Sequence, residues 1–115
     1  MSAETFSPIG NLVAAASVSA AGALVGDSRG VLSVTRPGGV SVGAYEVNLA
    51  PGSNITRASA TALATVRSDG IAPTGGDSPN VRHVDVDTIE VRTFVGGVLT
   101  DRPFDLEVVR RAIGA

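Results

Sequence analysis

Apolar and polar residues alternate along two segments of the chain. Between positions 44 and 49, an extended backbone places Tyr45, Val47 and Leu49 on one face and Glu46 and Asn48 on the other. Between positions 104 and 108, it places Phe104, Leu106 and Val108 inward and Asp105 and Glu107 outward. A period of two is typical of an antiparallel strand that buries one face and exposes the other. The pattern therefore predicts two half-buried strands.

Three further segments have weaker strand patterns. Residues 31–36 are Val-rich, and residues 58–66 carry an apolar residue, mostly alanine, at every second position. The Ser and Thr residues between the alanines favour a strand over the helix that alanine alone favours. In residues 81–95 the apolar positions change phase, from Val84 and Val86 to Ile89 and Val91. We expect a bulge or bend near Asp87-Thr88 to reconcile the two phases.

Turn-forming residues separate these segments. They include Gly26-Asp27-Ser28, Pro51-Gly52-Ser53 and the two-residue hairpin signal Gly96-Gly97. Short strands between regular turns predict an all-β fold, namely an antiparallel β-sandwich, jelly-roll-like, with about eight short strands. At 115 residues, positions 1–115 are expected to form a single domain. Residues 68–80 form the longest irregular segment and are predicted to be a loop.

Residues 12–25 read LVAAASVSAAGALV. The stretch resembles the apolar part of a secretory signal, but Glu4 precedes it without any Lys or Arg, whereas such a signal needs a positively charged start. It is also too short to span a membrane. We expect a strand of small residues, with a short helix as the alternative. We expect no conventional signal peptide or transmembrane segment, and the compartment stays open.

Composition narrows the chemistry and the partners. The chain has no Cys, which excludes disulfides and thiolate-based zinc sites. The formal net charge is -2 and no basic cluster occurs, so nucleic acid is not an expected partner. The apolar residues are mostly Val and Ala, which gives a thin core for a small domain. Oligomerisation would offset that deficit.

The segment Gly26-Asp27-Ser28-Arg29-Gly30 resembles the sequence around the nucleophile of trypsin-like proteases. A triad would need His83, the single histidine, together with a buried carboxylate. The chain is about half as long as that protease architecture requires and lacks its other signatures. We therefore interpret the segment as a polar turn, and we predict no enzymatic activity, no catalytic residues and no cofactor.

His83, Asp85 and Asp87 alternate, so on a strand their side chains would share one face. An imidazole and two carboxylates are able to hold a divalent cation. The alternative is that they are the outward residues of a strand whose inward residues are Val84 and Val86. We favour that solvated face and assign no metal site, while binding of a metal by these three residues stays open.

Smaller patterns carry less information. Asn54-Ile55-Thr56 is a glycosylation sequon without an accompanying export signal. Arg102 with Asp101, and Arg92 with Glu90, are expected to pair across strands, each for a few tenths of a kcal/mol.

As an ordered set, several motifs between Val18 and Arg110 resemble a known class of domain. They are Ala21-Gly22-Ala23-Leu24, Gly30-Val31-x-Ser33-Val34, Gly43-Ala44-Tyr45-Glu46-Val47-Asn48-Leu49, the Ala/Thr-rich residues 60–66, residues 86–94 with Val91-Arg92-Thr93, and Asp101-Arg102-Pro103-Phe104-Asp105-Leu106-Glu107-Val108. The set resembles small β-domains of actinobacterial hypothetical proteins and the C-terminal heads of phage tail fibres and collagen-associated proteins. Those heads are similar to the trimeric jelly rolls of the tumour necrosis factor and complement type. The resemblance implies a homotrimer that acts by binding or assembly.

The functional expectation is therefore a non-enzymatic structural or interaction protein. It would assemble as a compact homotrimer whose loops bind a protein or glycan of unknown identity. The alternative is a ligand- or carbohydrate-binding module on the same sandwich, with metal at His83, Asp85 and Asp87 as one version. A small hydrolase that uses Ser28 and His83 is the remaining, disfavoured hypothesis.

Overall fold

The computed structural model describes residues 11–38, 42–56, 59–67 and 78–111, and these residues form ten β-strands. The strands are β1 (Asn11–Val18), β2 (Leu24–Arg29), β3 (Val31–Thr35), β4 (Ala44–Leu49), β5 (Ala60–Val66), β6 (Asn80–Asp85), β7 (Thr88–Arg92), β8 (Phe94–Val95), β9 (Val98–Leu99) and β10 (Phe104–Arg110). Among the described residues, no helix long and apolar enough to cross a membrane occurs.

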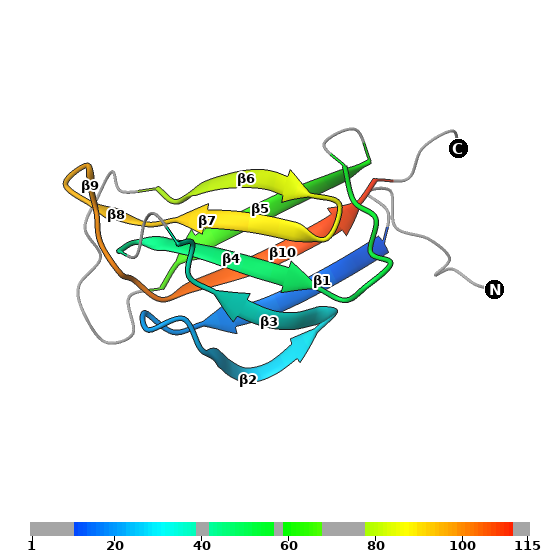
Figure 1. Cartoon of the computed structure of the whole chain (residues 1–115), viewed down its shortest axis with the longest axis horizontal. Coiled ribbons are helices and arrows are strands. Elements are labelled where there is room, and N and C mark those ends of the chain that lie inside the picture. The colour runs from blue at the N-terminus through cyan, green and yellow to red at the C-terminus, as the bar shows by residue number, and fades with distance from the viewer. Residues whose placement is uncertain (1–10, 39–41, 57–58, 68–77, 112–115) are drawn as a thin grey trace.

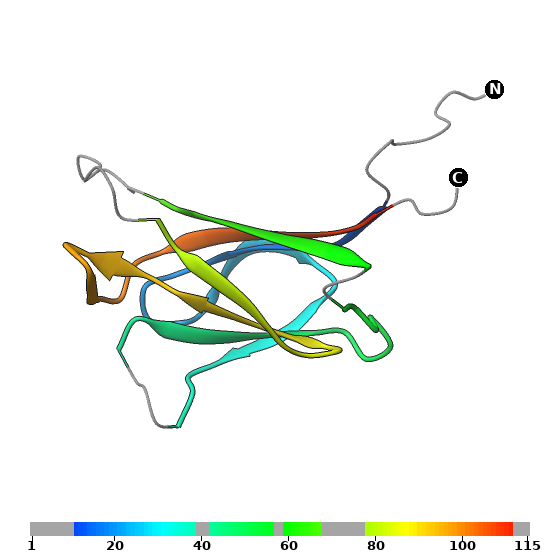
Figure 2. The same ribbon diagram turned by 90° about the horizontal axis from the view of Figure 1, so that it is seen from above.

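Eight of the strands form two antiparallel sheets of four. One has the order β2-β1-β10-β5 and is called the β1 sheet below; the other has the order β3-β4-β7-β6 and is called the β4 sheet. Figures 1 and 2 show the sheets face to face as two layers, with the β8–β9 hairpin at one end. The prediction of an all-β antiparallel sandwich is confirmed, with ten strands in place of about eight. Two packed four-stranded sheets are also the layout of a jelly roll.

The core lies between the two sheets and is built from alternate residues of facing strands. Its members on the two clearest strands are at most 2% exposed: Tyr45, Val47 and Leu49 on β4, and Phe104, Leu106 and Val108 on β10. The rings of Tyr45 and Phe104 meet edge to face with centroids 5.0 Å apart. Such a pair contributes about 0.5–1.5 kcal/mol beyond its buried area. Both half-buried strands are thus confirmed, with the predicted faces inward.

The alanine-rich segment is confirmed as strand β5. Ala62, Ala64 and Val66 pair with Val108, Leu106 and Phe104 of β10, the neighbouring strand, so they share its inward face. Ala60 is buried, and Ala62 and Ala64 pack against the core. The predicted first alanine, Ala58, lies outside the described residues.

Residues 12–25, expected as one strand, contain a chain reversal. β1 ends at Val18, and the N–H of Gly22 donates to the carbonyl of Ser19 over 2.9 Å. Gly22 has a φ of 96°, and the chain returns as β2, antiparallel to β1. The strand interpretation holds for β1, where Ala14 and Val18 are fully buried. The turn was missed because Ser19 and Gly22, which form it, stand among small apolar residues that alternate with serine as in a strand.

The polar turn predicted at residues 26–30 is wrong. Residues 26–29 belong to β2 and every one of them is exposed, while the chain turns at Gly30, which has a φ of 69°. The register with β1 shifts between Ala15, opposite Arg29, and Ser17, opposite Val25. β2 therefore bulges away from β1, as Figure 1 shows by its curvature. An edge strand accepts such polar residues because one of its sides faces solvent.

In residues 81–95 a bulge or bend was expected near Asp87-Thr88; the chain does bend there, but it reverses completely and forms two strands. β6 and β7 form a hairpin around a turn at Val86 and Asp87. Val84 and Val86, expected to point inward, are each 42% exposed, whereas Val81 packs against the core. The change of phase in the sequence therefore marks a reversal of the chain, because a turn lets each strand keep its own register.

The hairpin predicted at Gly96-Gly97 is confirmed. β8 pairs with β9 through Phe94 with Leu99 and Val95 with Val98. Gly96 and Gly97 have φ values of 58° and 81°, as a type I′ turn requires at both central positions. Of the predicted loop at residues 68–80, positions 68–77 lie outside the described residues.

Candidate functional site

The two residues of the hydrolase hypothesis are not brought together. Ser28 lies on β2 and His83 on β6. β2 is the edge strand of the β1 sheet that lies by β3, and β6 is the edge strand of the β4 sheet that lies by β5. These are opposite edges of the sandwich (Figure 1). The geometry therefore offers no pair of nucleophile and base at Ser28 and His83.

The three candidate metal ligands do not share a strand face. His83 is half-buried and pairs with the buried Ile89, while β6 ends at Asp85 and Asp87 lies in the turn. An Oδ1 atom of each aspartate accepts a backbone N–H, from Val86 at 2.7 Å for Asp85 and from Asn54 at 3.1 Å for Asp87. Within the described ranges, no three His, Cys, Asp or Glu side chains are grouped to hold a metal ion.

The glycosylation sequon lies in the connection before β5. Asn54 is exposed and has a φ of 52°, whereas Ile55 is 1% exposed and belongs to the core. The N–H of Ile55 donates to the carbonyl of Val86 over 2.8 Å. This segment therefore attaches the connection to the β6–β7 turn.

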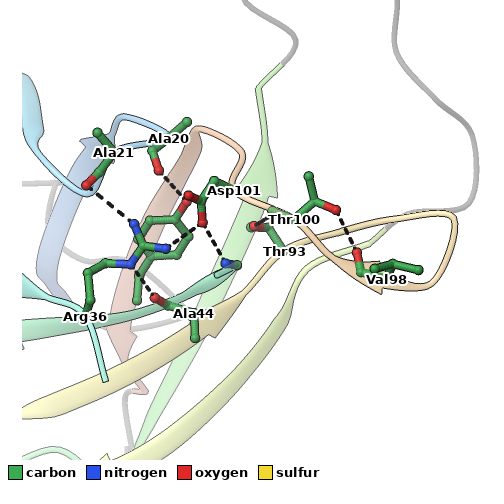
Figure 3. A network of polar contacts seen from close by, with 10 residues as sticks. Ala20, Ala21, Arg36, Ala44, Thr93, Val98, Thr100 and Asp101 are labelled. Atoms are coloured by element: carbon green, nitrogen blue, oxygen red, sulfur yellow. Dashed lines mark hydrogen bonds and ion pairs between the residues drawn. The ribbon is translucent and has the colours of Figure 1, made fainter. Parts of the chain in front are cut away.

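A polar network at one end of the sandwich joins three connections of the chain (Figure 3). Asp101 Oδ1 accepts from the N–H of Gly43 over 2.6 Å and from Arg36 over 2.5 Å. Arg36 Nε donates to the carbonyl of Ala44 over 2.8 Å, and its guanidinium lies 4.2 Å from the centroid of the Tyr45 ring. Desolvation alone would raise the pKa of Asp101, but the contacts with Gly43 and Arg36 outweigh it and lower the pKa.

The same network positions the Tyr45 hydroxyl, which donates to the carbonyl of Ala20 over 2.7 Å. Burial, helped by the Asp101 carboxylate, raises the pKa of this hydroxyl, so it stays protonated as a donor. The partners of Asp101, Arg36 and Tyr45 named here all belong to this same chain, in its connections or at the start of β4. We therefore assign the network a structural role: it ties the β1–β2 turn, the segment before β4 and the segment before β10 together.

The outer face of the β4 sheet carries a second cluster, on β6 and β7. The Glu90 carboxylate is only 3% exposed although it points outward. Its Oε1 accepts from Arg82 Nε over 2.8 Å and lies 2.6 Å from a terminal nitrogen of Arg82. Its Oε2 accepts from Arg92 Nε over 3.0 Å. Desolvation opposes ionisation of Glu90, but the two guanidinium groups outweigh it and lower the pKa.

Of the two predicted ion pairs, only the one between Arg92 and Glu90 forms. Arg92 contacts Glu90, but along the same strand rather than across strands. Asp101 contacts Arg36 instead of Arg102, and Arg102 donates to the carbonyl of Phe94 over 3.2 Å. The sequence carried a signal for the Glu90 cluster, because Arg82, Glu90 and Arg92 hold outward positions of adjacent strands. It carried none for Arg36 with Asp101, which lie 65 residues apart.

The outer face of the β1 sheet has a different character. Leu12 on β1 pairs with Val109 on β10, and Leu63 on β5 lies diagonally beside Val109. Leu12 and Leu63 are 38% and 57% exposed. We call these three residues the apolar stripe. An open hollow of about 360 Å³ lies further along this sheet, where β2 bulges away from β1, and Arg29 is among its lining residues.

Comparison with protein-family models, with curated proteins and with solved structures gives no match for this chain. The resemblance to trimeric heads therefore stays a prediction from the sequence motifs.

Proposed function

We propose that the protein is a non-enzymatic assembly and interaction module that forms a homotrimer through the outer face of its β1 sheet. The observation that supports this most directly is the apolar stripe of Leu12, Val109 and Leu63. Contiguous exposed apolar residues rimmed by polar ones are typical of interaction surfaces. On the outer face of the β4 sheet the corresponding positions are polar: Asn48 donates to Ser33 over 3.1 Å and accepts from Thr88 over 3.4 Å.

Charges on the same face favour a second copy of the chain as the occupant. Arg29 lies at one edge of the face, on β2, while Asp105 and Glu107 lie on β10 in its middle. In an assembly of identical chains, Arg29 of one protomer is available to the carboxylates of its neighbour, which would align the stripes. The proposal that three chains assemble rests on the resemblance of the sequence motifs to trimeric jelly-roll heads.

Loops would then bind the partner. The β8–β9 hairpin extends from one end of the sandwich (Figure 1), and its Val95 and Val98 are 40% and 66% exposed. We expect this hairpin to remain accessible when the β1 sheet is covered, and to contact the protein or glycan partner.

Light scattering coupled to gel filtration tests the assembly. The expected mass is three times the 11.5 kDa of the chain, and Leu63→Asp is expected to shift it to the monomer. Leu32→Asp is the matched control, because Leu32 is 65% exposed but lies on β3 of the other sheet. A monomeric native chain would contradict assembly, a dimer would contradict the trimer, and an unchanged Leu63→Asp trimer would contradict the proposed face.

The alternative function is a ligand- or carbohydrate-binding module, with or without a metal. Melting in the presence of Ca²⁺, Zn²⁺ or Mn²⁺ tests the metal version, because a cation that binds the folded state must raise the midpoint. The ligand version has support of its own in the cluster of Arg82 and Arg92 around Glu90.

A further inference from the structure

We infer that the outer face of the β4 sheet holds a binding site for a carboxylate, formed by Arg82, Arg92 and Asn80 around Glu90. The site is a hollow of about 340 Å³ lined by Asn80, Val81, Arg82, Glu90 and Arg92. It lies on the opposite side of the sandwich from the apolar stripe. The inference therefore goes beyond the proposed assembly and stands or falls independently of it.

Glu90 holds both arginines in place. Its two oxygens contact Nε of Arg82 at 2.8 Å and Nε of Arg92 at 3.0 Å, so the carboxylate lies between the guanidinium groups. Arginine side chains lose considerable rotamer freedom when they are ordered, about 2 kcal/mol each. Because Glu90 already orders them, a ligand that binds them pays less of that entropy.

The contacts with Glu90 leave donors available. They use Nε and one terminal nitrogen of Arg82, and Nε of Arg92. The remaining terminal nitrogens of both side chains form no further hydrogen bond or ion pair within the part of the chain that is described. Arg82 and Arg92 side chains are 67% and 39% exposed, so these N–H groups are accessible. Asn80 pairs with Arg92 across β6 and β7 and adds an exposed amide.

Charge and shape favour a carboxylate. The two guanidinium groups and the ionised Glu90 sum to one positive charge, which the Glu46 carboxylate opposite Glu90 offsets on the β4 side, so the positive charge that attracts an anion lies towards β6. The two terminal nitrogens of Arg92 form a planar fork that matches the two oxygens of a carboxylate. Glu46 lies on the far side of Glu90, on β4, so the anion is expected on the β6 side.

Titration of the ¹⁵N-labelled chain tests the site. The arginine Nε–Hε and Asn80 amide resonances are followed at constant ionic strength with sodium acetate, glucuronate, sulfate or phosphate. We expect saturable shifts of Arg82, Arg92 and Asn80 with the two carboxylates. Tighter binding of glucuronate than of acetate indicates a sugar acid, and equal binding indicates a small carboxylate. Sulfate or phosphate binding as tightly as acetate overturns the preference for carboxylate.

Three variants locate the binding. Arg92→Gln is expected to weaken it roughly tenfold, the equivalent of losing one charge-assisted pair. Asn80→Ala leaves the contacts of Glu90 intact and is expected to weaken it roughly threefold. Arg111→Gln removes the same charge from an exposed position after β10 of the other sheet and should leave affinity unchanged. Shifts that do not saturate, or an equal loss in Arg111→Gln and Arg92→Gln, overturn the inference.

Discussion

Two glycines with the same φ angle distinguish the cost of a left-handed backbone from the cost of a steric clash. Gly26 and Gly30 both have a φ of 69°. A Cβ placed on Gly26 has no atom within 4 Å, whereas a Cβ on Gly30 lies 2.2 Å from the carbonyl oxygen of Val13. Gly30 is the point where the chain passes from β2 in one sheet to β3 in the other. The two alanine variants should therefore lose very different amounts of stability.

The left-handed conformation costs an L-residue roughly 1–2 kcal/mol. Part of that cost is offset, because alanine reduces the freedom of the unfolded chain by about 0.4–1 kcal/mol. We expect Gly26→Ala to lose about 0.5–1.5 kcal/mol from these two effects together. In Gly30→Ala the β1 backbone must also move, which adds roughly 1–3 kcal/mol as an overpacked core does. The expected total loss for Gly30→Ala is about 2–4 kcal/mol.

Urea unfolding of both variants, followed by circular dichroism, measures the two losses. The slope of the free energy of unfolding against urea should match the native chain for Gly26→Ala, because the fold is retained. Losses that agree within about 0.5 kcal/mol would refute the close approach of Gly30 to Val13, because the left-handed conformation alone would then account for both variants.

Three further predictions concern the polar groups and the core. Asp101→Ala should lose about 1–3 kcal/mol of unfolding free energy in urea, because the buried N–H of Gly43 loses its acceptor. Asp101→Asn keeps an acceptor and should lose less than about 1 kcal/mol. Equal losses in the two variants would contradict this role of Asp101 as the acceptor of Gly43. Asp101 and Glu90 have pKa values lowered by folding, so their stabilisation is complete above the ordinary values of 3.8 and 4.5 and declines as the pH falls through the lowered values. The difference in melting temperature between the native chain and Glu90→Gln should therefore shrink on acidification from about pH 6 to about pH 3, and a constant difference would count against the pairing. Phe104→Ala should lose about 3–5 kcal/mol in urea unfolding, because Phe104 is fully buried against Tyr45, and a loss below about 1 kcal/mol would contradict the core assignment.

Local periodicity was sufficient where a strand is half-buried. The positions of Tyr45 and Phe104 were predictable because a period of two assigns each side chain to one face of a sheet. The reversal at Val86 and Asp87 was predicted only as a bulge or bend near Asp87-Thr88, because the segment has no Gly or Pro and apolar residues alternate on both sides of it. There the turn is held by distant partners: the N–H of Leu49 donates to the carbonyl of Asp87 over 2.7 Å.

The candidate sites were less predictable, because they depend on which segments the fold brings together. Arg36 and Asp101 meet only after the β3–β4 and β9–β10 connections are placed side by side. His83, Asp85 and Asp87 are close in sequence, yet the strand ends between them and separates their side chains. Proximity in sequence was therefore a poor guide to a metal site. The alternating spacing places side chains on one face only while the strand continues, and β6 ends at Asp85.

The two outer faces show how one sequence pattern gives two kinds of surface. Glu90 and Glu107 both occupy outward positions of central strands, but Arg82 and Arg92 cover Glu90, whereas Glu107 is exposed beside Leu63. The first arrangement holds the donors of the proposed carboxylate site, and the second is part of the proposed assembly face. Because the faces lie on opposite sides of the sandwich, assembly through the β1 sheet leaves every carboxylate site open. A trimer should therefore bind one carboxylate per chain, with the same affinity as the monomer that Leu63→Asp is expected to produce.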